Sequence, residues 1–503
     1  MVSEIHNGQA APIPAPFNMA AYVLDHSTQT PDKTALSIVT LDGSTDWTYG
    51  ALRGAVLGFA TGLLQLGLSA GDTVLLRLGN SVDFPIAYLA TIAVGMIPVP
   101  TSAQLTVPEV TRIAKERSPS LIVSDGLTTL PDGDFKLLTT DQMHPMYHLP
   151  PAKFRYGEPN RPAYMIYTSG TSGQPRAVLH AHHAVWARRM MWDGWMGLKS
   201  TDRVLHAGAF NWTYTLGAGL MDPWAIGATS LIPDASIKAS DLPQLLSKHH
   251  ATIFAAAPGV YRQMLRSEMP ALPDLRHGLS AGEKMPPQLH TEWNAKTGTH
   301  VYEAFGMSEC STFISSSPAH PVDAASLGYP QSGRHVAIIN ENGPVAFGDP
   351  GDIAIDRDDP GLMLEYPDAP DETRAKFQGR WFKTGDTATM HADGAVTYLG
   401  RSDDMMNAGG YRVSPIEVES AMRLHPDITD CAATEVDIKT GVRVIAAFYE
   451  SGEPINETDL TRHAETHLAR YKQPRLFVHR TDLPRGNNNK LARKQLRDQF
   501  TIT

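Results

Sequence analysis

The sequence predicts an α/β protein with a large N-terminal body and a small α+β C-terminal cap. An apolar run at 72–78 predicts a strand and the pattern at 87–96 predicts a helix, and this alternation recurs, which indicates mixed and parallel sheets with helices. Residues 328–365 are richer in β-formers and glycine turns, which indicates a smaller β subdomain. We therefore expect a body at 1–400 and a cap at 404–503.

The remaining elements follow in chain order. The helix at 87–96 is followed by a turn marked by Pro98 and Pro100. Further short apolar runs predict βαβ units, with strands at 122–123, 205–206 and 229–232. In the cap we expect a helix that opens at 415–419, a strand at 442–448 and a helix at 460–468.

The composition favours a soluble enzyme. The chain has 43 Lys+Arg against 53 Asp+Glu, a formal charge of −10, which argues against a nucleic-acid or anionic-membrane partner. No apolar run reaches the ~18 residues that a membrane span needs, and the N-terminus lacks a signal-peptide pattern. The two cysteines, Cys310 and Cys431, imply no disulfide framework. We expect a cytoplasmic protein.

One loop, at residues 167–176, combines hydroxyls, glycines and one cation in a way that suits a polyphosphate. Gly170 and Gly173 let the backbone approach a ligand closely, so that N–H groups converge on phosphate oxygens. Arg176 supplies the cation, and the hydroxyl donors are Thr168, Ser169, Thr171 and Ser172. The Walker A spacing is absent, which disfavours a P-loop kinase or GTPase. On composition alone, a solvated turn is the alternative.

This loop resembles the signature Tyr-Thr-Ser-Gly-Thr-Thr-Gly-x-Pro-Lys-Gly of the adenylate-forming superfamily. That superfamily contains acyl- and aryl-CoA synthetases, adenylation domains of peptide synthetases and beetle luciferases. Arg176 stands where the family usually has lysine, and Ala177 where it usually has glycine. Arginine keeps the charge in a planar fork, so we expect altered kinetics and retained activity. Further motifs occur in the family's order, and the resemblance covers nearly the whole chain.

The next two motifs imply an adenine site and a metal ligand. In similar enzymes a segment of small residues packs against adenine, and here it corresponds to Ser280, Ala281, Gly282 and Glu283. Residues 301–309 resemble the family's Tyr-Gly-x-Thr-Glu. A carboxylate that faces a nucleotide needs a hard cation between them, so Glu309 is the expected Mg²⁺ ligand. Ser308 replaces threonine and keeps a hydroxyl for the α-phosphate, whereas Phe305 replaces tyrosine and loses one.

Two later motifs imply the ribose site. Asp386 follows a glycine turn, and by resemblance its carboxylate accepts hydrogen bonds from the ribose hydroxyls, which suits a two-oxygen acceptor. Tyr398 and Arg401 match the motif Tyr-x-Gly-Arg-x-Asp-Asp. The resemblance makes Arg401 a second ribose or phosphate contact.

The resemblance also implies a mobile cap that serves two half-reactions. Asp403, within a hinge at 401–403, occupies the family's hinge position, and Lys490 falls on the catalytic lysine, with Asn489 in place of glycine before it. Rotation about the hinge would replace Lys490 by a loop with adjacent glycines that permit a narrow thiol tunnel and an arginine that holds a phosphate of CoA or of the nucleotide. These residues are Gly409, Gly410 and Arg412.

The acyl pocket is expected from resemblance to draw on Phe210, Trp212, Tyr214, Ala257, Ala304, Gly306 and Met307. Aromatic rings close a short or flat cavity and alanines leave width, which favours a small aliphatic or aromatic acid. Asn211 replaces the aspartate that pairs with the substrate ammonium in amino-acid adenylating domains, which disfavours an amino acid. Nearby histidines at 180, 182 and 183, on an expected helix start, are better explained by packing or exposure than by a metal site.

Together these motifs predict an ATP-dependent carboxylate:CoA ligase that forms an acyl-adenylate and then a CoA thioester. Its expected partners are a small carboxylic acid, ATP, Mg²⁺ and CoA, with no nucleic acid and no membrane span, and the chain is expected to be a monomer or homodimer. Two alternatives remain. A stand-alone enzyme that loads a carrier-protein thiol would share every adenylation residue, and an inactive nucleotide-binding protein would require a broken catalytic set.

Overall fold

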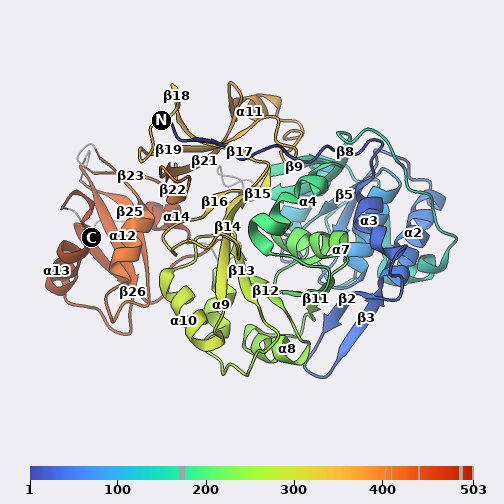
Figure 1. The fold of residues 1–503 in the computed structure, drawn as a ribbon, viewed down its shortest axis with the longest axis horizontal. Helices are drawn as coiled ribbons and strands as arrows, with labels where there is room; N and C mark the ends of the chain where they lie inside the picture. The colour runs from blue at the N-terminus through green and yellow to red at the C-terminus, as the bar shows by residue number, and fades with distance from the viewer. Residues whose placement is uncertain are drawn as a thin grey trace. The chain divides into compact units, whose positions relative to one another are not determined.

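The computed structural model describes residues 1–168, 176–402, 404–408, 411–439, 442–468, 470–486 and 491–500. Two compact units make up the chain (Figure 1). The N-terminal unit comprises His6–His335 and Asp356–Arg380, and the C-terminal unit comprises Met1–Ile5, Val336–Ile355 and Trp381–Thr503. The predicted class is confirmed: a large mixed α/β part and a small α+β C-terminal part. The predicted boundary at 401–403 stays a prediction.

A nine-stranded sheet dominates the described part of the N-terminal unit, in the order β16-β15-β14-β13-β12-β10-β11-β2-β3. The strands from β14 to β2 run parallel to one another, while β15, β16 and β3 pair antiparallel at the two sides. Their bounds are β2 Thr34–Val39, β3 Ser44–Thr48, β10 Arg203–His206, β11 Thr229–Pro233, β12 Ile253–Ala256, β13 His277–Ala281, β14 His300–Met307, β15 Ser311–Ser315 and β16 Tyr329–Pro330.

A smaller parallel sheet has the order β5-β4-β6-β7, and an antiparallel pair, β8 and β9, flanks the predicted phosphate loop. The bounds are β4 Thr73–Arg77, β5 Ile97–Pro100, β6 Leu121–Ser124, β7 Leu137–Thr139, β8 Pro162–Thr168 and β9 Arg176–Ala181. The loop predicted at 167–176 thus begins at the end of β8 and ends at the start of β9.

Helices and turns complete the N-terminal unit. The helices are α1 Met19–Val23, α2 Tyr49–Gln65, α3 Asp83–Ala93, α4 Val107–Arg117, α5 Thr140–Met143, α6 Ala184–Ala187, α7 Asp222–Ile226, α8 Leu242–Lys248, α9 Pro258–Met264, α10 Pro287–Thr297 and α11 Pro370–Ala375, with strand β20 at Phe377–Gln378. Short 3₁₀ turns lie at Asp25–Ser27, His144–His148 and Ala239–Asp241, and π-helical turns at Trp192–Met196 and Thr215–Met221.

The helix predicted at 87–96 is displaced toward the N-terminus in the structure. It starts at Asp83, with Pro85 in its first turn, where a missing N–H costs no helical hydrogen bond. It ends before Gly95, whose φ of 83° is in the left-handed region, a typical helix stop. Most side chains of α3 are buried against α2 in the main apolar core, so the helix is apolar on all sides and its periodicity marks no boundary.

The parallel arrangement brings the carboxyl ends of several strands to one edge of the main sheet. In the register, Ala256 pairs with Ser280, Ser280 with Glu303 and Ala281 with Ala304. The segments that leave this edge carry most of the predicted nucleotide and acyl residues of the unit. Ligands of open α/β sheets bind at such an edge.

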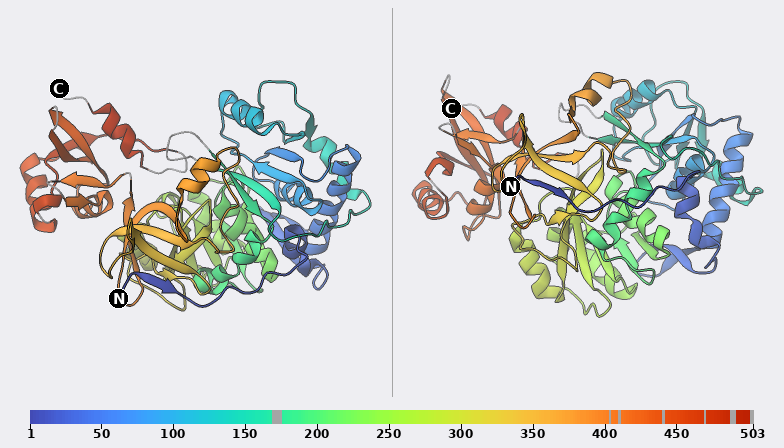
Figure 2. Two further views of the ribbon diagram at one scale, coloured as in Figure 1. Left: turned by 90° about the horizontal axis from the view of Figure 1, so that it is seen from above. Right: turned by 45° about the horizontal axis from the view of Figure 1, so that its top comes forward.

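The C-terminal unit combines a β-sheet with a small α+β part (Figure 2). In the first sheet β1, β17, β19 and β21 follow one another, with β18 on β17 and β22 on β21; β23 pairs with β24, and β25-β26-β27 form a third sheet. The bounds are β1 Glu4–His6, β17 His335–Asn340, β18 Gly343–Pro344, β19 Gly351–Asp356, β21 Trp381–Met390, β22 Val396–Arg401, β23 Met406–Ala408, β24 Tyr411–Val413, β25 Asp430–Lys439, β26 Val442–Glu450, β27 Leu476–Arg480, α12 Pro415–Met422, α13 Glu457–His467 and α14 Arg493–Gln499, with a 3₁₀ turn at Arg470–Lys472. The elements predicted after residue 404 are confirmed, although α13 starts three residues earlier than expected.

Candidate active site

Glu309, the predicted metal ligand, lies in the turn between β14 and β15 and is held from two sides. The Tyr366 hydroxyl donates to Glu309 Oε1 at 2.6 Å. The Met363 backbone N–H donates to the Glu309 carbonyl oxygen, also at 2.6 Å. The residue as a whole is half-buried, and its carboxylate is fixed by the Tyr366 hydroxyl.

Ser308 is anchored through its backbone by a buried histidine. His180 Nε2 lies 2.7 Å from the Ser308 carbonyl oxygen, and because a carbonyl only accepts, Nε2 carries the proton. The ring stacks on Tyr164 with centroids 4.9 Å apart. Burial lowers the pKa of His180 to about 4, so the ring is neutral near pH 7. The histidine expected on a helix start lies on β9 instead, because the strand continues to Ala181 and α6 begins only at Ala184.

A cavity of about 20 Å³, room for roughly one water molecule, lies beside Ser308. Its lining includes Arg188, Thr213 and Ser311. Arg188 is buried and forms a two-pronged ion pair with Asp222, with Nε–Oδ1 at 2.8 Å and Nη2–Oδ2 at 2.5 Å, and also donates to Ser311. Because Asp222 neutralises the guanidinium, Arg188 brings no net charge to this cavity, whose lining also includes Leu216 and Met221.

The segment predicted to pack against adenine leaves β13 with an open backbone. Gly282 has a φ of 99°, and a Cβ there would lie 2.8 Å from the Trp212 ring, so the site requires glycine. Ala281 is buried and Glu283 is partly exposed. The Ser280 hydroxyl is buried and has no hydrogen-bond partner in the described ranges.

Glu303 anchors the far end of this segment to β14. Its buried carboxylate accepts from Lys284 Nζ at 2.5 Å and from the Met285 N–H at 2.7 Å, and His290 Nε2 lies 3.1 Å away. Burial alone would raise the pKa of Glu303, but the Lys284 charge and the hydrogen bonds outweigh it and hold that pKa below its ordinary value. The carboxylate is therefore ionised and fixes residues 284 and 285.

The structure places the predicted acyl residues in three different surroundings. Trp212 and Tyr214 make an edge contact with centroids 5.3 Å apart, and Tyr214 belongs with Ala304 to one buried cluster. Phe210 packs instead on Phe84 in the main core, with centroids 5.4 Å apart. Of the remaining acyl residues, Ala257 caps α9 and Met307 ends β14, and Gly306 lets β15 approach so closely that a Cβ would lie 2.2 Å from the Ser311 oxygen. Phe305, predicted for the nucleotide site, packs on Phe313.

The predicted phosphate loop is described only at its ends. Thr168 ends β8 and Arg176 begins β9. Arg176 forms an ion pair with Glu372 of α11, and its guanidinium carbon lies 5.9 Å from the centroid of the Tyr366 ring. Ser169, Gly170, Thr171, Ser172 and Gly173 lie outside the described residues.

The predicted ribose group is assembled within the C-terminal unit. Tyr398 donates to Asp386 Oδ1 at 2.7 Å, and Arg401 Nη1 lies 3.3 Å from Asp386 Oδ2. Burial and the Asp386 charge raise the pKa of Tyr398 well above its ordinary value, so the phenol stays protonated and donates. The predicted glycine turn before Asp386 is wrong, because Gly385, with a φ of 82°, and Asp386 both lie within strand β21.

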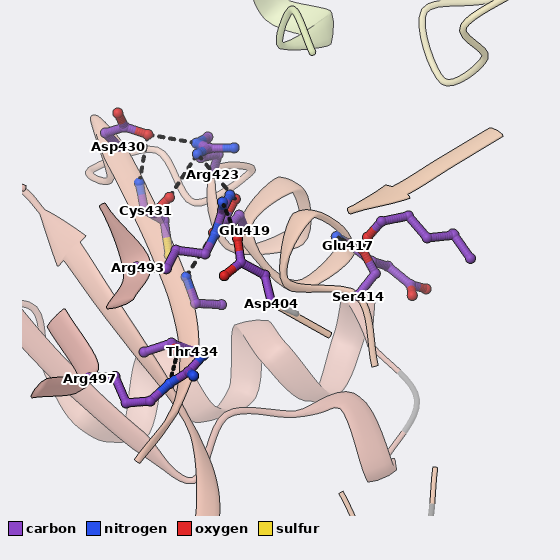
Figure 3. A network of polar contacts seen from close by, with 12 residues as sticks. Asp404, Ser414, Glu417, Glu419, Arg423, Asp430, Cys431, Thr434, Arg493 and Arg497 are labelled. Atoms are coloured by element: carbon purple, nitrogen blue, oxygen red, sulfur yellow. Dashed lines mark hydrogen bonds and ion pairs between the residues drawn. The ribbon is translucent and has the colours of Figure 1, made fainter. Parts of the chain in front are cut away.

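A buried ion-pair network joins α12 to Arg493, the first residue of α14 (Figure 3). Glu419, 1% exposed, accepts from Arg493 Nε and Nη2, both at 2.7 Å, and from the Ala433 N–H at 2.9 Å. Arg493 Nη1 also lies 3.7 Å from Asp404. The Glu419 charge raises the pKa of Arg493 against the effect of burial. The network thus connects α12, the start of α14 and the residue after Asp403.

Four predicted site residues of the C-terminal unit lie outside the described residues: Asp403, Gly409, Gly410 and Lys490. Arg412 lies on β24, where it pairs with Asn407 of β23. Arg485 and Leu491, on either side of the undescribed residues 487–490, form a β-bridge. The Arg485 side chain forms an ion pair with Asp430, so both sides of the Lys490 segment are held by carboxylates.

The described residues are suited to a Mg²⁺ ion that is bound together with a nucleotide. They do not form a metal site built from several protein ligands. In the described ranges no group of three or more His, Cys, Asp or Glu side chains could hold a metal ion. Mg²⁺ usually binds through one or two carboxylates plus phosphate oxygens, which a single oriented Glu309 satisfies. No helix in the described part of the chain combines the length and apolarity that a membrane crossing demands.

Sequence reasoning missed Tyr366, Glu303 and Glu419. Each acts through a contact to a residue far along the chain or on another strand, and no local motif marks it. For Tyr366 a weak signal existed, since a lone aromatic precedes a helix start at Pro370.

Two family models match this chain. The model described as AMP-binding enzyme matches residues 23–366, and the model described as AMP-binding enzyme C-terminal domain matches residues 417–490. A 4-hydroxybenzoate--CoA/benzoate--CoA ligase of Rhodopseudomonas palustris is 29% identical, over 92% of this chain and 90% of that protein. The mitochondrial acyl-coenzyme A synthetase ACSM3 of Rattus norvegicus is 28% identical, over 98% of this chain and 92% of that protein.

Solved structures agree with these matches. The anthranilate CoA ligase AuaEII in complex with anthranoyl-AMP superposes with a TM-score of 0.86 at 25% identity, covering 97% of this chain and 98% of that chain. A benzoate CoA ligase from Burkholderia xenovorans LB400 gives a TM-score of 0.86 at 27% identity, covering 96% of this chain and 100% of that chain.

Proposed function

This chain belongs to the AMP-binding enzyme family, in the acyl- and aryl-CoA synthetase branch of the adenylate-forming superfamily, and we propose that it is an ATP-dependent carboxylate:CoA ligase. One observation carries the proposal: the Glu309 carboxylate, directly after Ser308, is oriented by Tyr366, and Glu309 is only half-buried. An oriented carboxylate beside a hydroxyl suits a metal–nucleotide complex.

In the first half-reaction, a carboxylate oxygen of the acid attacks the α-phosphorus of ATP. The new P–O bond gives the acyl-adenylate, and the bond to pyrophosphate breaks. Lys490 supplies positive charge to the transition state, Arg176 binds the departing phosphates, and Ser308 donates to an α-phosphate oxygen. Mg²⁺, held by Glu309 when bound, neutralises phosphate charge.

The nucleoside is held by the other predicted groups. Asp386 accepts from the ribose hydroxyls, while Tyr398 and Arg401 fix its carboxylate. The backbone of residues 280–283 packs against adenine, and the buried Ser280 hydroxyl is a free donor for the ligand within the described ranges.

In the second half-reaction, the CoA sulfur attacks the acyl carbon and AMP leaves. We propose that the cap, residues 404–503, rotates about 401–403, so that Lys490 leaves and the loop with Gly409, Gly410 and Arg412 guides the thiol. A cytoplasmic location and a monomeric or dimeric state remain predictions.

The proposed substrate is a small aromatic or a short to medium aliphatic acid. The edge-on pair of Trp212 and Tyr214 beside Ala304 supports a flat, short pocket. Relatives and structural neighbours named as benzoate, 4-hydroxybenzoate and anthranilate ligases support an aromatic acid.

Substitution of Lys490 tests this assignment. Lys490→Ala should lower ATP–pyrophosphate exchange by roughly 10² to 10³, the scale for one preorganised charge donor. Lys494→Ala, an exposed lysine four positions on, is the matched control and should leave exchange unchanged. Wild-type exchange in Lys490→Ala would refute the assignment. Asp403→Pro should spare exchange and stop thioester formation, and thioester formation at the wild-type rate would refute the hinge.

A further inference from the structure

We propose that Tyr366 is a positioning residue that sets both the metal-binding carboxylate Glu309 and the phosphate-binding cation Arg176; this rests on the proposed function. Tyr366 belongs to neither motif. It lies 57 residues after Glu309 in the sequence, yet contacts both charged residues.

The hydroxyl of Tyr366 orients Glu309. It donates at 2.6 Å to Oε1, and Tyr366 itself is only 4% exposed, so the bond is shielded from water. A carboxylate has about four acceptor positions, and one donor leaves Oε2 and one position of Oε1 for a cation. Partners of this kind orient the residues that bind a metal directly.

The ring of Tyr366 faces the other charge. The guanidinium carbon of Arg176 lies 5.9 Å from the ring centroid, within the range of a cation–π contact. Glu372 pairs with the same guanidinium. The two contacts hold Arg176 at the start of β9, where its charge remains one-third exposed.

The backbone next to Tyr366 is hydrogen-bonded both to β9 and to the turn that carries Glu309. Leu364 donates to the Leu179 oxygen at 2.8 Å on β9, and Met363 donates to the Glu309 oxygen at 2.6 Å. Tyr366 N–H donates to Thr373 Oγ1 of α11 at 3.0 Å. Residues 363–366 thus form a spacer between β9 and the Glu309 turn, and Tyr366 adds side-chain contacts at the same junction.

Two substitutions separate the two contacts. Tyr366→Phe removes the hydroxyl and keeps the ring, whereas Tyr366→Leu removes both. Dissociation constants for ATP are measured by calorimetry without acid substrate, once with excess Mg²⁺ and once in EDTA. Tyr366→Phe should weaken ATP binding with Mg²⁺ by about 10- to 100-fold, the effect of losing such a partner, and leave binding in EDTA unchanged.

Tyr366→Leu should additionally weaken ATP binding in EDTA by about two- to fivefold, the fold-change of a cation–π contact at a partly exposed site. Tyr156→Phe, at a tyrosine that is 55% exposed, is the matched control and should bind ATP as the wild type does. Melting temperatures of all variants accompany the titrations.

The outcomes distinguish this inference from the proposed function. If the wild type binds ATP with Mg²⁺ and Tyr366→Phe binds it equally well, the role of Tyr366 is overturned. The proposed function would then still stand. Equal losses with and without Mg²⁺ in Tyr366→Phe, together with a lower melting temperature, would make the residue merely structural and also overturn it. Wild type that binds no ATP would overturn both the inference and the proposed function.

Discussion

At the scale of single residues, the Asp386 carboxylate has two roles. It pairs with Tyr398 and Arg401, and in the proposed function it binds the ribose. Tyr398 and Arg401 hold its carboxylate from within the same unit, at 2.7 and 3.3 Å. In the proposed function, the same carboxylate accepts from the ribose hydroxyls, and its two oxygens match the two donors of a vicinal diol.

Asp386→Asn should therefore raise the KM for ATP by about 10- to 100-fold, the scale of a hydrogen bond to a charged group, with little change in the KM for the acid. Pyrophosphate exchange at varied ATP measures this. Asp393→Asn, an exposed aspartate beyond the end of β21, is the control. An unchanged KM for ATP would remove Asp386 from the nucleotide site.

At the scale of elements, the Glu419–Arg493 pair joins α12 to α14. Both partners are largely buried, and breaking such a pair leaves an uncompensated charge that costs about 3–5 kcal/mol. Glu419→Gln should lower the unfolding free energy of the C-terminal unit by about this amount. Glu419→Gln with Arg493→Met should recover part of the loss, because no buried charge is then unpaired.

Urea unfolding followed by fluorescence or circular dichroism measures both variants. The exposed pair of Arg443 and Asp437, with side chains 64% and 62% exposed, gives the control: Asp437→Asn should change stability by less than about 1 kcal/mol. A Glu419→Gln variant as stable as that control would contradict the network's role.

Elements were predicted where local chemistry decides them. Ser414 accepts from the Glu417 N–H and Pro415 opens the helix, so the start of α12 was predictable from the sequence. The start of α3 was not predictable, because the helix is buried on all sides and its apolar pattern therefore marks no boundary. The π-helical turn at Thr215–Met221 has no sequence signal that we recognise.

The candidate site divides in the same way. Glu309, Asp386 and Arg401 stand in segments that resemble the family's motifs, and that resemblance singled them out. Tyr366 and Glu419 act across 57 and 74 residues, and only the fold brings them to their partners. Phe210 was predicted for the acyl pocket, but it packs against Phe84 of α3 in the main apolar core.

At the scale of the whole molecule, buried neutral histidines make the protein sensitive to acid. Burial lowers the pKa of His180 and His277 to about 4 and of His182 and His206 to about 3. Above about pH 6.5 both folded and unfolded forms are neutral, so these groups cost nothing. As the pH falls, the unfolded chain binds protons that the folded chain does not, and stability is lost down to the folded pKa values.

Each such histidine should lower the unfolding free energy by about 1.4 kcal/mol per pH unit between pH ~6 and ~4. His206 has no hydrogen-bond partner for either ring nitrogen in the described ranges, so His206→Leu removes one titration at little polar cost. In His206→Leu, the unfolding free energy should depend less steeply on pH than in the exposed control His148→Leu. The difference in slope should correspond to about one proton bound on unfolding. Equal slopes would show that His206 is protonated in the folded protein.

The central claim is that this chain joins a small carboxylic acid to CoA through an adenylate. Mass spectrometry of products after incubation with ATP, Mg²⁺, CoA and a pooled panel of short, branched and aromatic acids tests it most directly. We predict an ATP-dependent acyl-CoA together with AMP and pyrophosphate, and an acyl-adenylate when CoA is left out. AMP and pyrophosphate without a CoA ester would contradict the claim and favour a carrier-protein acceptor, and ADP with inorganic phosphate would contradict adenylate chemistry altogether.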